Sequence, residues 1–181
     1  IVEGNPARIV GYIQTTGPAT GAPPAGPAGP APREAPAVQR LGVGEAALYR
    51  MRRVADLRGA LTVGEVDREL PFEPKRYFLV FDVPSEELRG EHAHRRCHQF
   101  LLCAHGACTL LLDDGRSRSE VRLDRPELGV HMPPMTWGTQ YRYSRDAVLL
   151  VFASEHYDPD DYIRTYDEFL EEVNGKTRPG A

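Results

Sequence analysis

Several features are scarce in this 181-residue sequence, and each scarcity excludes a class of protein. The three cysteines, Cys97, Cys103 and Cys108, form no Cys-x-x-Cys pair, and their odd number does not suit the disulfide scaffold of a secreted domain. The longest apolar runs, such as residues 147–153, are far shorter than the roughly 20 residues that cross a bilayer. We therefore expect a cytoplasmic protein that does not enter a membrane.

Clustered positive charge and glycine-rich nucleotide loops are also missing. The formal net charge is −4, and no stripe of Lys and Arg appears along the chain. Neutralising a phosphate backbone requires such a stripe, so we expect no nucleic-acid partner. The glycine fingerprint of dinucleotide-binding folds is absent as well, and we expect no redox cofactor.

What is present divides the chain into unlike regions. Residues 17–37 consist almost wholly of Gly, Ala and Pro, a composition that offers few large apolar groups to offset the entropy cost of ordering. We expect a flexible linker over residues 15–40, a folded domain over 41–176 and a disordered tail over 177–181. Because the chain starts at Ile1 without a methionine, we expect it to be part of a longer protein.

The domain predicted over 41–176 has the pattern of an all-β protein. Short segments rich in β-branched and aromatic residues follow one another at close spacing, which is typical of a sandwich or small barrel. These segments are 74–83, 98–106, 107–115, 119–124, 129–134, 138–144 and 147–154. Asp114-Gly115 predicts a hairpin turn, since Asp-Gly supplies the positive φ that tight turns need.

The C-terminal part of the domain has helical periodicity. Asp158 suits an N-cap position and Pro159 the first helical position, so we expect the helix to begin there. Gly175 is a suitable end. Apolar residues, the tyrosines among them, recur every three or four positions and predict one buried face that packs across the barrel. The fold class predicted is therefore an all-β barrel with a C-terminal α-helix.

Two histidines in the stretch RGEHAH are the strongest chemical signal. His92 and His94 lie two residues apart, so on a strand both side chains point to the same face. Three interpretations are open: a metal centre, a metal-free acid/base pair, or buried structural imidazoles. We expect structural or surface roles for the remaining histidines, His98, His105, His131 and His156.

The spacing G-x-H-x-H-x4-Q-x6-G resembles the first motif of the cupin superfamily, in which two histidines and a glutamate bind a metal. Gln99 occupies the glutamate position here, and a neutral amide is a poor ligand for a transition metal. The histidine of the second cupin motif is also missing, because His131 is out of step with that pattern. Too few ligands are left for a tightly held ion, so we favour a metal-free pair that transfers protons near neutral pH.

A wider resemblance covers residues 41–173. The sequence is similar to the cupin-type sugar nucleotide 3,4-ketoisomerases, which act on dTDP-4-keto-6-deoxyglucose. The resemblance rests on residues 71–84, 89–94, 98–115, 123–137 and 147–170. It implies a cupin jelly roll, no cofactor and a homodimer, in which a strand near residues 51–66 is exchanged.

The resemblance also implies roles for site residues. His92 is the expected base, with His94 beside it, and Tyr77 is the expected proton shuttle. If the family's tyrosine instead aligns with Phe78, His94 must shuttle the proton. Substrate contacts are expected from two arginines that suit a diphosphate, and from an amide and an indole: Arg76, Arg89, Gln99 and Trp137. Gly138 departs from the histidine that many relatives carry after the tryptophan.

The first 14 residues resemble the last coil of hexapeptide-repeat acyltransferases. The chain would then be the C-terminal part of a bifunctional acyltransferase and ketoisomerase in the synthesis of N-acylated dTDP-3-amino sugars. Two other functions remain open for the barrel: a nucleotide-sugar-binding module without turnover, and a metal-dependent cupin enzyme.

Overall fold

The computed structural model describes residues 2–3, 8–9, 36–84 and 86–175. The chain divides into two units, residues 1–33 and 34–181. In the first unit, strands Val2–Glu3 (β1) and Arg8–Ile9 (β2) pair antiparallel. The predicted acyltransferase remnant is not tested by this pair and stays a prediction. The predicted tail, and the predicted linker as far as residue 35, lie outside the described residues.

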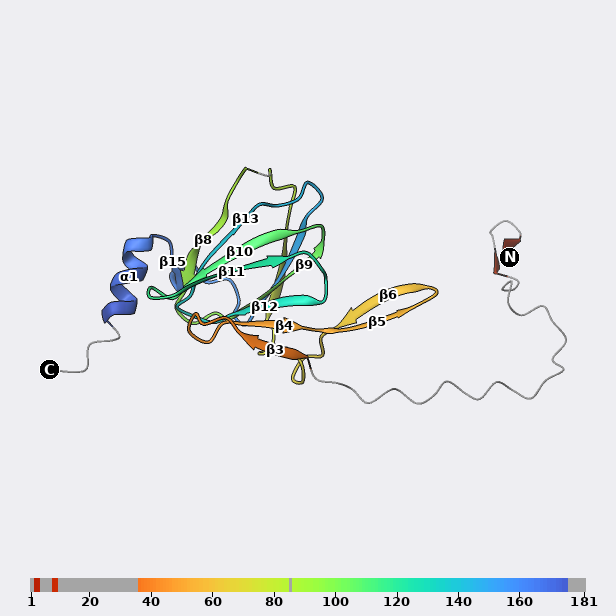
Figure 1. Ribbon diagram of the computed structural model, residues 1–181, viewed down its shortest axis with the longest axis horizontal. Coiled ribbons are helices and arrows are strands. Elements are labelled where there is room, and N and C mark those ends of the chain that lie inside the picture. Colours follow the sequence, from red (N-terminus) through yellow and green to blue (C-terminus); the bar gives the residue numbers. More distant parts are fainter. Residues whose placement is uncertain (1, 4–7, 10–35, 85, 176–181) are drawn as a thin grey trace. The chain divides into compact units, whose positions relative to one another are not determined.

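The second unit is built from two antiparallel sheets (Figure 1). The five-stranded sheet has the order β11-β10-β13-β8-β15, and the six-stranded sheet has the order β3-β4-β12-β9-β14-β7. The strands are Ala37–Arg40 (β3), Ala47–Arg50 (β4), Arg76–Phe81 (β7), Arg89–His94 (β8), Gln99–His105 (β9), Cys108–Asp113 (β10), Arg118–Leu123 (β11), Leu128–Met132 (β12), Trp137–Tyr141 (β13), Val148–Ala153 (β14) and Tyr162–Ile163 (β15).

A hairpin of strands Arg52–Asp56 (β5) and Gly59–Val63 (β6) projects away from these two sheets (Figure 1). Its strands pair with each other and belong to neither large sheet. Most of its residues are exposed. In water a two-stranded hairpin is marginally stable at best by itself.

The main core lies between the two sheets. Strand β14 shows the pattern that builds it, because Leu149, Val151 and Ala153 are buried while Val148, Leu150 and Phe152 are only half-buried. Alternate side chains of a strand point to opposite faces, so one face of each sheet fills the core. All seven predicted strands are present, and the Asp114-Gly115 turn joins β10 to β11 with φ +85° at Gly115.

The predicted start of the C-terminal helix is wrong. Asp158 does act as a cap, but it caps only a 3₁₀ turn, Pro159–Asp161. The chain then becomes strand β15, which pairs with Ala93 and His94 at the edge of the five-stranded sheet. The α-helix α1 begins later and spans Tyr166–Gly175. Tyr162 and Ile163 thus pair with the edge of β8 as a strand, although both fit the helical periodicity of the sequence.

Helix α1 covers a second, smaller core on the outer face of the five-stranded sheet. Its centre is made of Ala93, Ile163 and Phe169, all fully buried. Trp137 packs here too, with ring centroids 5.4 Å from Tyr166 and 5.7 Å from Phe169. The outward direction of Ala93 follows from the strand alternation predicted for the histidine pair.

The structure also bears on the predicted end of the linker and on the prediction that the chain does not enter a membrane. The linker was expected to continue to residue 40, but Ala37–Arg40 form strand β3, so this boundary was placed too late. No helix in the described part of the chain is both long and apolar enough to cross a bilayer. All three cysteines are buried and free.

Candidate functional site

The histidine pair is carried by a strand with a bulge. Where β8 pairs with β13, Gly138 lies opposite His92 and Thr139 lies opposite Gly90, which leaves Glu91 as the extra residue. Gly90 has φ +81°, and a Cβ atom there would lie 2.6 Å from the carbonyl oxygen of Gly138. Only glycine fits this position. The bulge re-aims the strand and directs both histidines toward the space between the sheets.

His92 is oriented by its own strand. Its Nδ1 atom lies 2.9 Å from the carbonyl oxygen of Gly90, which can only accept a hydrogen bond, so Nδ1 carries the proton. Burial lowers the pKa of His92 below its ordinary value, and the charge of Arg164 lowers it further, against the opposing effect of the Gly90 carbonyl. The ring is therefore neutral near pH 7 with its lone pair on Nε2. That atom has no hydrogen-bond partner among the described residues.

His94 is held at both nitrogens. Its Nδ1 atom lies 2.9 Å from Oδ2 of Asp161, and its Nε2 atom lies 3.1 Å from Nε2 of Gln99. All three side chains are buried. Burial, together with the nearby His92, lowers the pKa of His94 to about 4, against the opposing effect of Asp161. A neutral imidazole thus lies in the middle of three hydrogen-bonded polar side chains. They run from Gln99 on β9 through His94 on β8 to Asp161 in the 3₁₀ turn.

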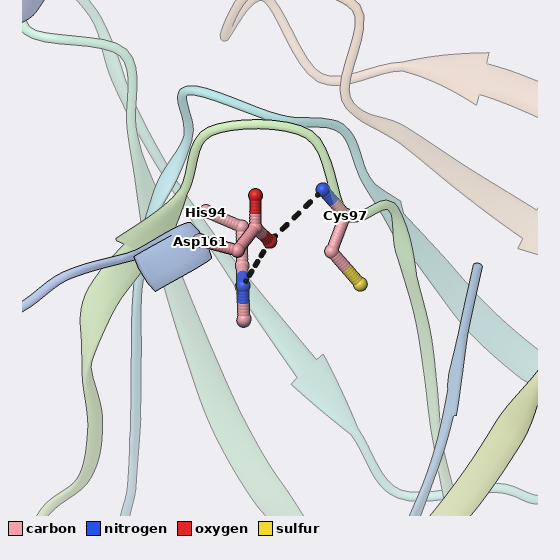
Figure 2. Close-up of side chains that lie close together, drawn as sticks. All are labelled: His94, Cys97 and Asp161. Carbon is pink, nitrogen blue, oxygen red and sulfur yellow. Dashed lines mark hydrogen bonds and ion pairs between the residues drawn. The ribbon is translucent and has the colours of Figure 1, made fainter. Parts of the chain in front are cut away.

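His94, Cys97 and Asp161 bring three possible metal ligands together, and Figure 2 shows how they lie. The carboxylate of Asp161 accepts hydrogen bonds from the backbone amide of Arg96 at 2.8 Å and from that of Cys97 at 3.2 Å, besides Nδ1–H of His94. Three N–H donors already converge on this carboxylate. The donor set does not fit a cation, because binding one would break these buried hydrogen bonds.

Tyr162 completes an aromatic cluster at the histidines. Its ring centroid lies 4.3 Å from that of His94 and 5.0 Å from that of His92. Its hydroxyl group lies 3.4 Å from Nη2 of Arg76, which belongs to the other sheet. Arg164 lies over the same tyrosine ring, 4.4 Å from the centroid. Tyr162 therefore links the two sheets beside the imidazole pair.

A cavity of about 170 Å³ lies between the sheets next to this cluster. Its apolar wall comes from the six-stranded sheet and its polar groups mainly from β8 and β13. The lining residues are Phe78, Val80, Arg89, Gly90, His92, Gln99, Leu101, Gln140, Leu149 and Val151. The volume is below the 300–1,000 Å³ typical of complete ligand pockets, so it suits one ring-sized part of a ligand.

The chain matches a known family over most of this unit. The family model described as "FdtA: WxcM-like, C-terminal" matches residues 44–174. The chain belongs to the FdtA family. The match includes both sheets except β3, and all residues of the cavity wall.

Three relatives of this FdtA-family chain that are at least 30% identical to it are 3,4-ketoisomerases or oxoisomerases by name. The TDP-4-oxo-6-deoxy-alpha-D-glucose-3,4-oxoisomerase of Aneurinibacillus thermoaerophilus is 40% identical over 122 residues, which make up 67% of this chain and 88% of the relative. A mutant of the 3,4-ketoisomerase QdtA from Thermoanaerobacterium thermosaccharolyticum, in complex with TDP-4-keto-6-deoxyglucose, matches with a TM-score of 0.72 and 31% identity over 76% of this chain and 99% of that one.

A 3,4-ketoisomerase from Helicobacter canadensis matches with a TM-score of 0.70 and 37% identity, over 72% of this chain and 98% of that one. These relatives confirm the ketoisomerase resemblance found in the sequence, and with it the cupin-like fold class.

Four predicted residues of this FdtA-family site lie together. His92, Gln99 and Arg89 line the cavity, and His94 is in contact with the first two. Arg76 is close by, because its guanidinium lies 5.6 Å from the centroid of the cavity-lining Phe78 ring. It also donates a hydrogen bond to the carbonyl oxygen of Glu155 at 3.1 Å.

The structure does not bring Tyr77 or Trp137 to the cavity. Alternate residues of β7 face opposite sides, so Phe78 lines the cavity while Tyr77 points away from it and is 67% exposed. This orientation does not favour Tyr77 as the shuttle, and its role stays a prediction. Trp137 precedes Gly138, the partner of His92, and so faces the α1 side of its sheet. This position does not favour a direct substrate contact for Trp137, which also stays a prediction.

Sequence reasoning missed Asp161, Tyr162 and Gln140. The first two were assigned to a helix, and only the pairing of β15 with β8 brings them to the histidines. Gln140 is buried, lines the cavity and sits two residues after Gly138 on β13. Strand alternation from Gly138 predicts this inward direction, so the signal for Gln140 was present in the sequence.

Proposed function

We propose that this chain is a TDP-sugar 3,4-ketoisomerase that converts TDP-4-keto-6-deoxyglucose into the corresponding 3-keto sugar. The observation that carries the proposal is the free Nε2 lone pair of His92 on the wall of a cavity that suits one sugar ring. The relatives that share most of the fold carry this activity in their names. The protein is accordingly an isomerase.

The chemistry needs a base at one carbon and a proton return at its neighbour. The C3 proton is acidified by the C4 carbonyl, and Nε2 of His92 removes it to leave an enediolate. The same imidazole then returns a proton to C4, while the hydroxyl proton moves from O3 to O4. No atoms are gained or lost and no electrons leave the sugar, so the reaction needs no redox cofactor.

We assign the transfer between the two oxygens to Tyr162. Tyr77 faces away, Phe78 has no hydroxyl group, and both nitrogens of His94 are engaged. Among the described residues, Tyr162 is the tyrosine whose ring contacts both imidazoles. Its hydroxyl accepts a hydrogen bond from Arg76, which leaves the phenolic proton available and stabilises the oxygen when that proton leaves.

The nucleoside diphosphate must lie outside the 170 Å³ cavity. Arg89 lines the cavity and is exposed, which suits a diphosphate at its mouth. Arg76 lies between the rings of Phe78 and Tyr157, at 5.6 Å from each centroid, and Tyr157 is 62% exposed. We infer that these two arginines bind the phosphates and that the Tyr157 ring is open to a base or sugar.

A homodimer is part of the proposal. Strand β7 is an edge strand, and its outward side chains Tyr77, Leu79 and Phe81 are exposed. The same outer sheet face carries an apolar groove of about 260 Å³. Edge strands and apolar faces need covering, and the exposed β5–β6 hairpin needs a partner surface. A second copy of the chain supplies both, with the hairpin reaching onto that copy. Fusion to an acyltransferase and a cytoplasmic location remain proposals from the sequence.

Incubation of the purified protein with TDP-4-keto-6-deoxyglucose, followed by NMR of the sugar carbons, tests the proposed activity. The carbonyl signal should move from C4 to C3, and a chelator should not slow the change. A substrate that binds but stays unchanged would support the binding module instead. Loss of turnover with the chelator, restored by a transition metal, would support the metal-dependent enzyme.

A further inference from the structure

The side chains of Asp161, His94 and Gln99 form a buried chain whose hydrogen-bond direction can be worked out from one end. Among the described residues, the carboxylate of Asp161 faces only donors: the backbone amides of Arg96 and Cys97, the His94 ring and, at 3.6 Å, Nε of Arg96. A carboxylate that collects three N–H groups acts as an acceptor throughout. Nδ1 of His94 must therefore carry the proton of this contact.

The second step follows from the neutrality of the ring. A buried neutral imidazole has one proton, and here it is on Nδ1, so Nε2 of His94 can only accept. The group that faces Nε2 is the terminal amide nitrogen of Gln99, 3.1 Å away, and it must donate. This fixes the amide of Gln99 in one of its two possible orientations.

The third step concerns the other end of that amide. Gln99 lines the cavity, and its Oε1 atom has no hydrogen-bond partner among the described residues. Oε1 is also not one of the two buried side-chain polar atoms without a partner in that part of the chain, Nε of Arg52 and the hydroxyl of Tyr143. It is therefore open to the cavity and presents an acceptor there.

We infer that Asp161 is a positioning residue that sets the tautomer of His94 and thereby turns the carbonyl oxygen of Gln99 toward the substrate. This inference rests on the proposed function for its substrate. A 4-keto sugar has an acceptor at C4 and a hydroxyl donor at C3. The cavity wall then accepts a hydrogen bond from the C3 hydroxyl and disfavours a ligand that has only an acceptor at that place.

The first test reads the tautomer in the unaltered protein. Nitrogen-15 NMR of the His94 ring at pH 7 should show a protonated Nδ1 and an unprotonated Nε2. The opposite tautomer would overturn the inference, whatever the enzyme's activity. This measurement does not depend on turnover. It therefore separates a failure of the inferred Asp161–His94–Gln99 hydrogen-bond direction from a failure of the proposed function.

The second test uses Asp161→Asn to reverse the direction of the hydrogen bonds that run from residue 161 through His94 to Gln99. When its oxygen keeps the 2.8 Å hydrogen bond from the Arg96 amide, the asparagine places its NH₂ group where Oδ2 was, gives up the longer contact with the Cys97 amide and donates to Nδ1. This moves the His94 proton to Nε2, turns the Gln99 amide over and presents N–H groups to the cavity. We expect the flipped tautomer in NMR and a KM for the 4-keto sugar roughly tenfold to hundredfold higher. Asp113→Asn is the matched control, because Asp113 is equally buried but bonds to Arg118 and Tyr166.

A double variant provides the rescue. In Asp161→Asn with Gln99→Glu, Nε2–H of His94 donates to the new carboxylate, whose second oxygen again offers an acceptor to the cavity. We expect most of the lost affinity to return, measured with a chelator present because the glutamate completes a metal-binding pattern. An unchanged KM in an Asp161→Asn variant that has the flipped tautomer, or no recovery in a folded double variant with that tautomer, would overturn the inference.

Discussion

The carbonyl oxygen of Gly90 accepts a hydrogen bond from Nδ1 of His92 at 2.9 Å, within a single bulged strand. This contact decides that the lone pair of the proposed base is on Nε2. It depends on a backbone conformation, φ +81°, that side-chain-bearing residues rarely adopt. In the stretch RGEHAH, the backbone conformation at Gly90 therefore matters for the orientation of His92 as much as the side chains do.

Replacing Gly90 tests whether the bulge orients His92. Gly90→Ala places a Cβ atom 2.6 Å from the Gly138 carbonyl and 2.8 Å from the Gln140 amide, so the bulge must shift. We expect a loss of isomerase activity and a fall of at least about 1–2 kcal/mol in the free energy of unfolding, measured by denaturant titration. Gly42→Ala is the control, because Gly42 has φ +73° with open space around it. Equal losses in both variants would show that backbone strain alone is responsible.

The two tyrosine assignments predict opposite results. Tyr162→Phe removes the hydroxyl beside Arg76, and we expect turnover to fall by about 10²-fold or more while the protein stays folded. Tyr77→Phe should leave turnover unchanged, because this side chain faces away from the cavity. Steady-state kinetics on both variants checks the assignment. A slow Tyr77→Phe variant together with a fast Tyr162→Phe variant would restore the prediction from the sequence.

The proposed dimer surface can be tested by charge. Leu79→Glu puts a carboxylate among the exposed apolar side chains of β7, and burying it in an interface is costly. We expect the wild-type protein to sediment as a dimer and the Leu79→Glu variant as a monomer. Leu88→Glu, at a comparably exposed leucine outside the strands, is the control. A wild-type monomer in sedimentation would remove the dimer from the proposal.

Buried histidines make stability depend on pH in a defined direction. Burial lowers the pKa of His94 and of His131 to about 4, while each titrates near 6.5 when unfolded. Their contribution is complete above about pH 6.5 and is lost as the pH falls toward 4, since the unfolded chain then binds protons that the folded chain excludes. We expect each histidine to contribute on the order of 3 kcal/mol to the complete loss.

His131→Asn separates this contribution from that of the carboxylates. Denaturant titrations at pH 7.5 and pH 5 should show a smaller loss of stability in His131→Asn than in the wild-type protein. His105→Asn serves as a control, because its side chain is 70% exposed on the surface. An equal loss in all three proteins would contradict the assignment to His131.

Most of the fold could be predicted from strand patterns in the sequence, in which side chains alternate between two faces. The seven predicted strands and the Asp114-Gly115 turn could be found because each depends on residues adjacent in the chain. The face shared by His92 and His94 follows from the same period of two. Tyr77 and Trp137 show the limit of that reasoning, since Tyr77 lies next to the cavity-lining Phe78, and Trp137 next to Gly138, the partner of His92. For these two residues the role predicted from residue type and the direction given by strand alternation disagree.

The contact of Asp161 and Tyr162 with the histidines could not be read from the sequence. Their segment has helical periodicity, and local propensity favours a helix from Asp158. The edge of β8 offers unpaired backbone groups, and pairing with β15 satisfies them over two residues. Tertiary pairing therefore overrides the local signal, and 67 residues of chain separate His94 from the carboxylate that orients it.

Exchange of the C3 hydrogen with solvent tests the central claim most directly, that His92 is the base. TDP-4-keto-6-deoxyglucose incubated in deuterium oxide with the wild-type protein should incorporate deuterium at the reacting carbons, followed by NMR. In His92→Asn the fold should persist, and the rate of incorporation should fall by about 10²-fold or more. Wild-type rates of incorporation in a folded His92→Asn variant would contradict the claim.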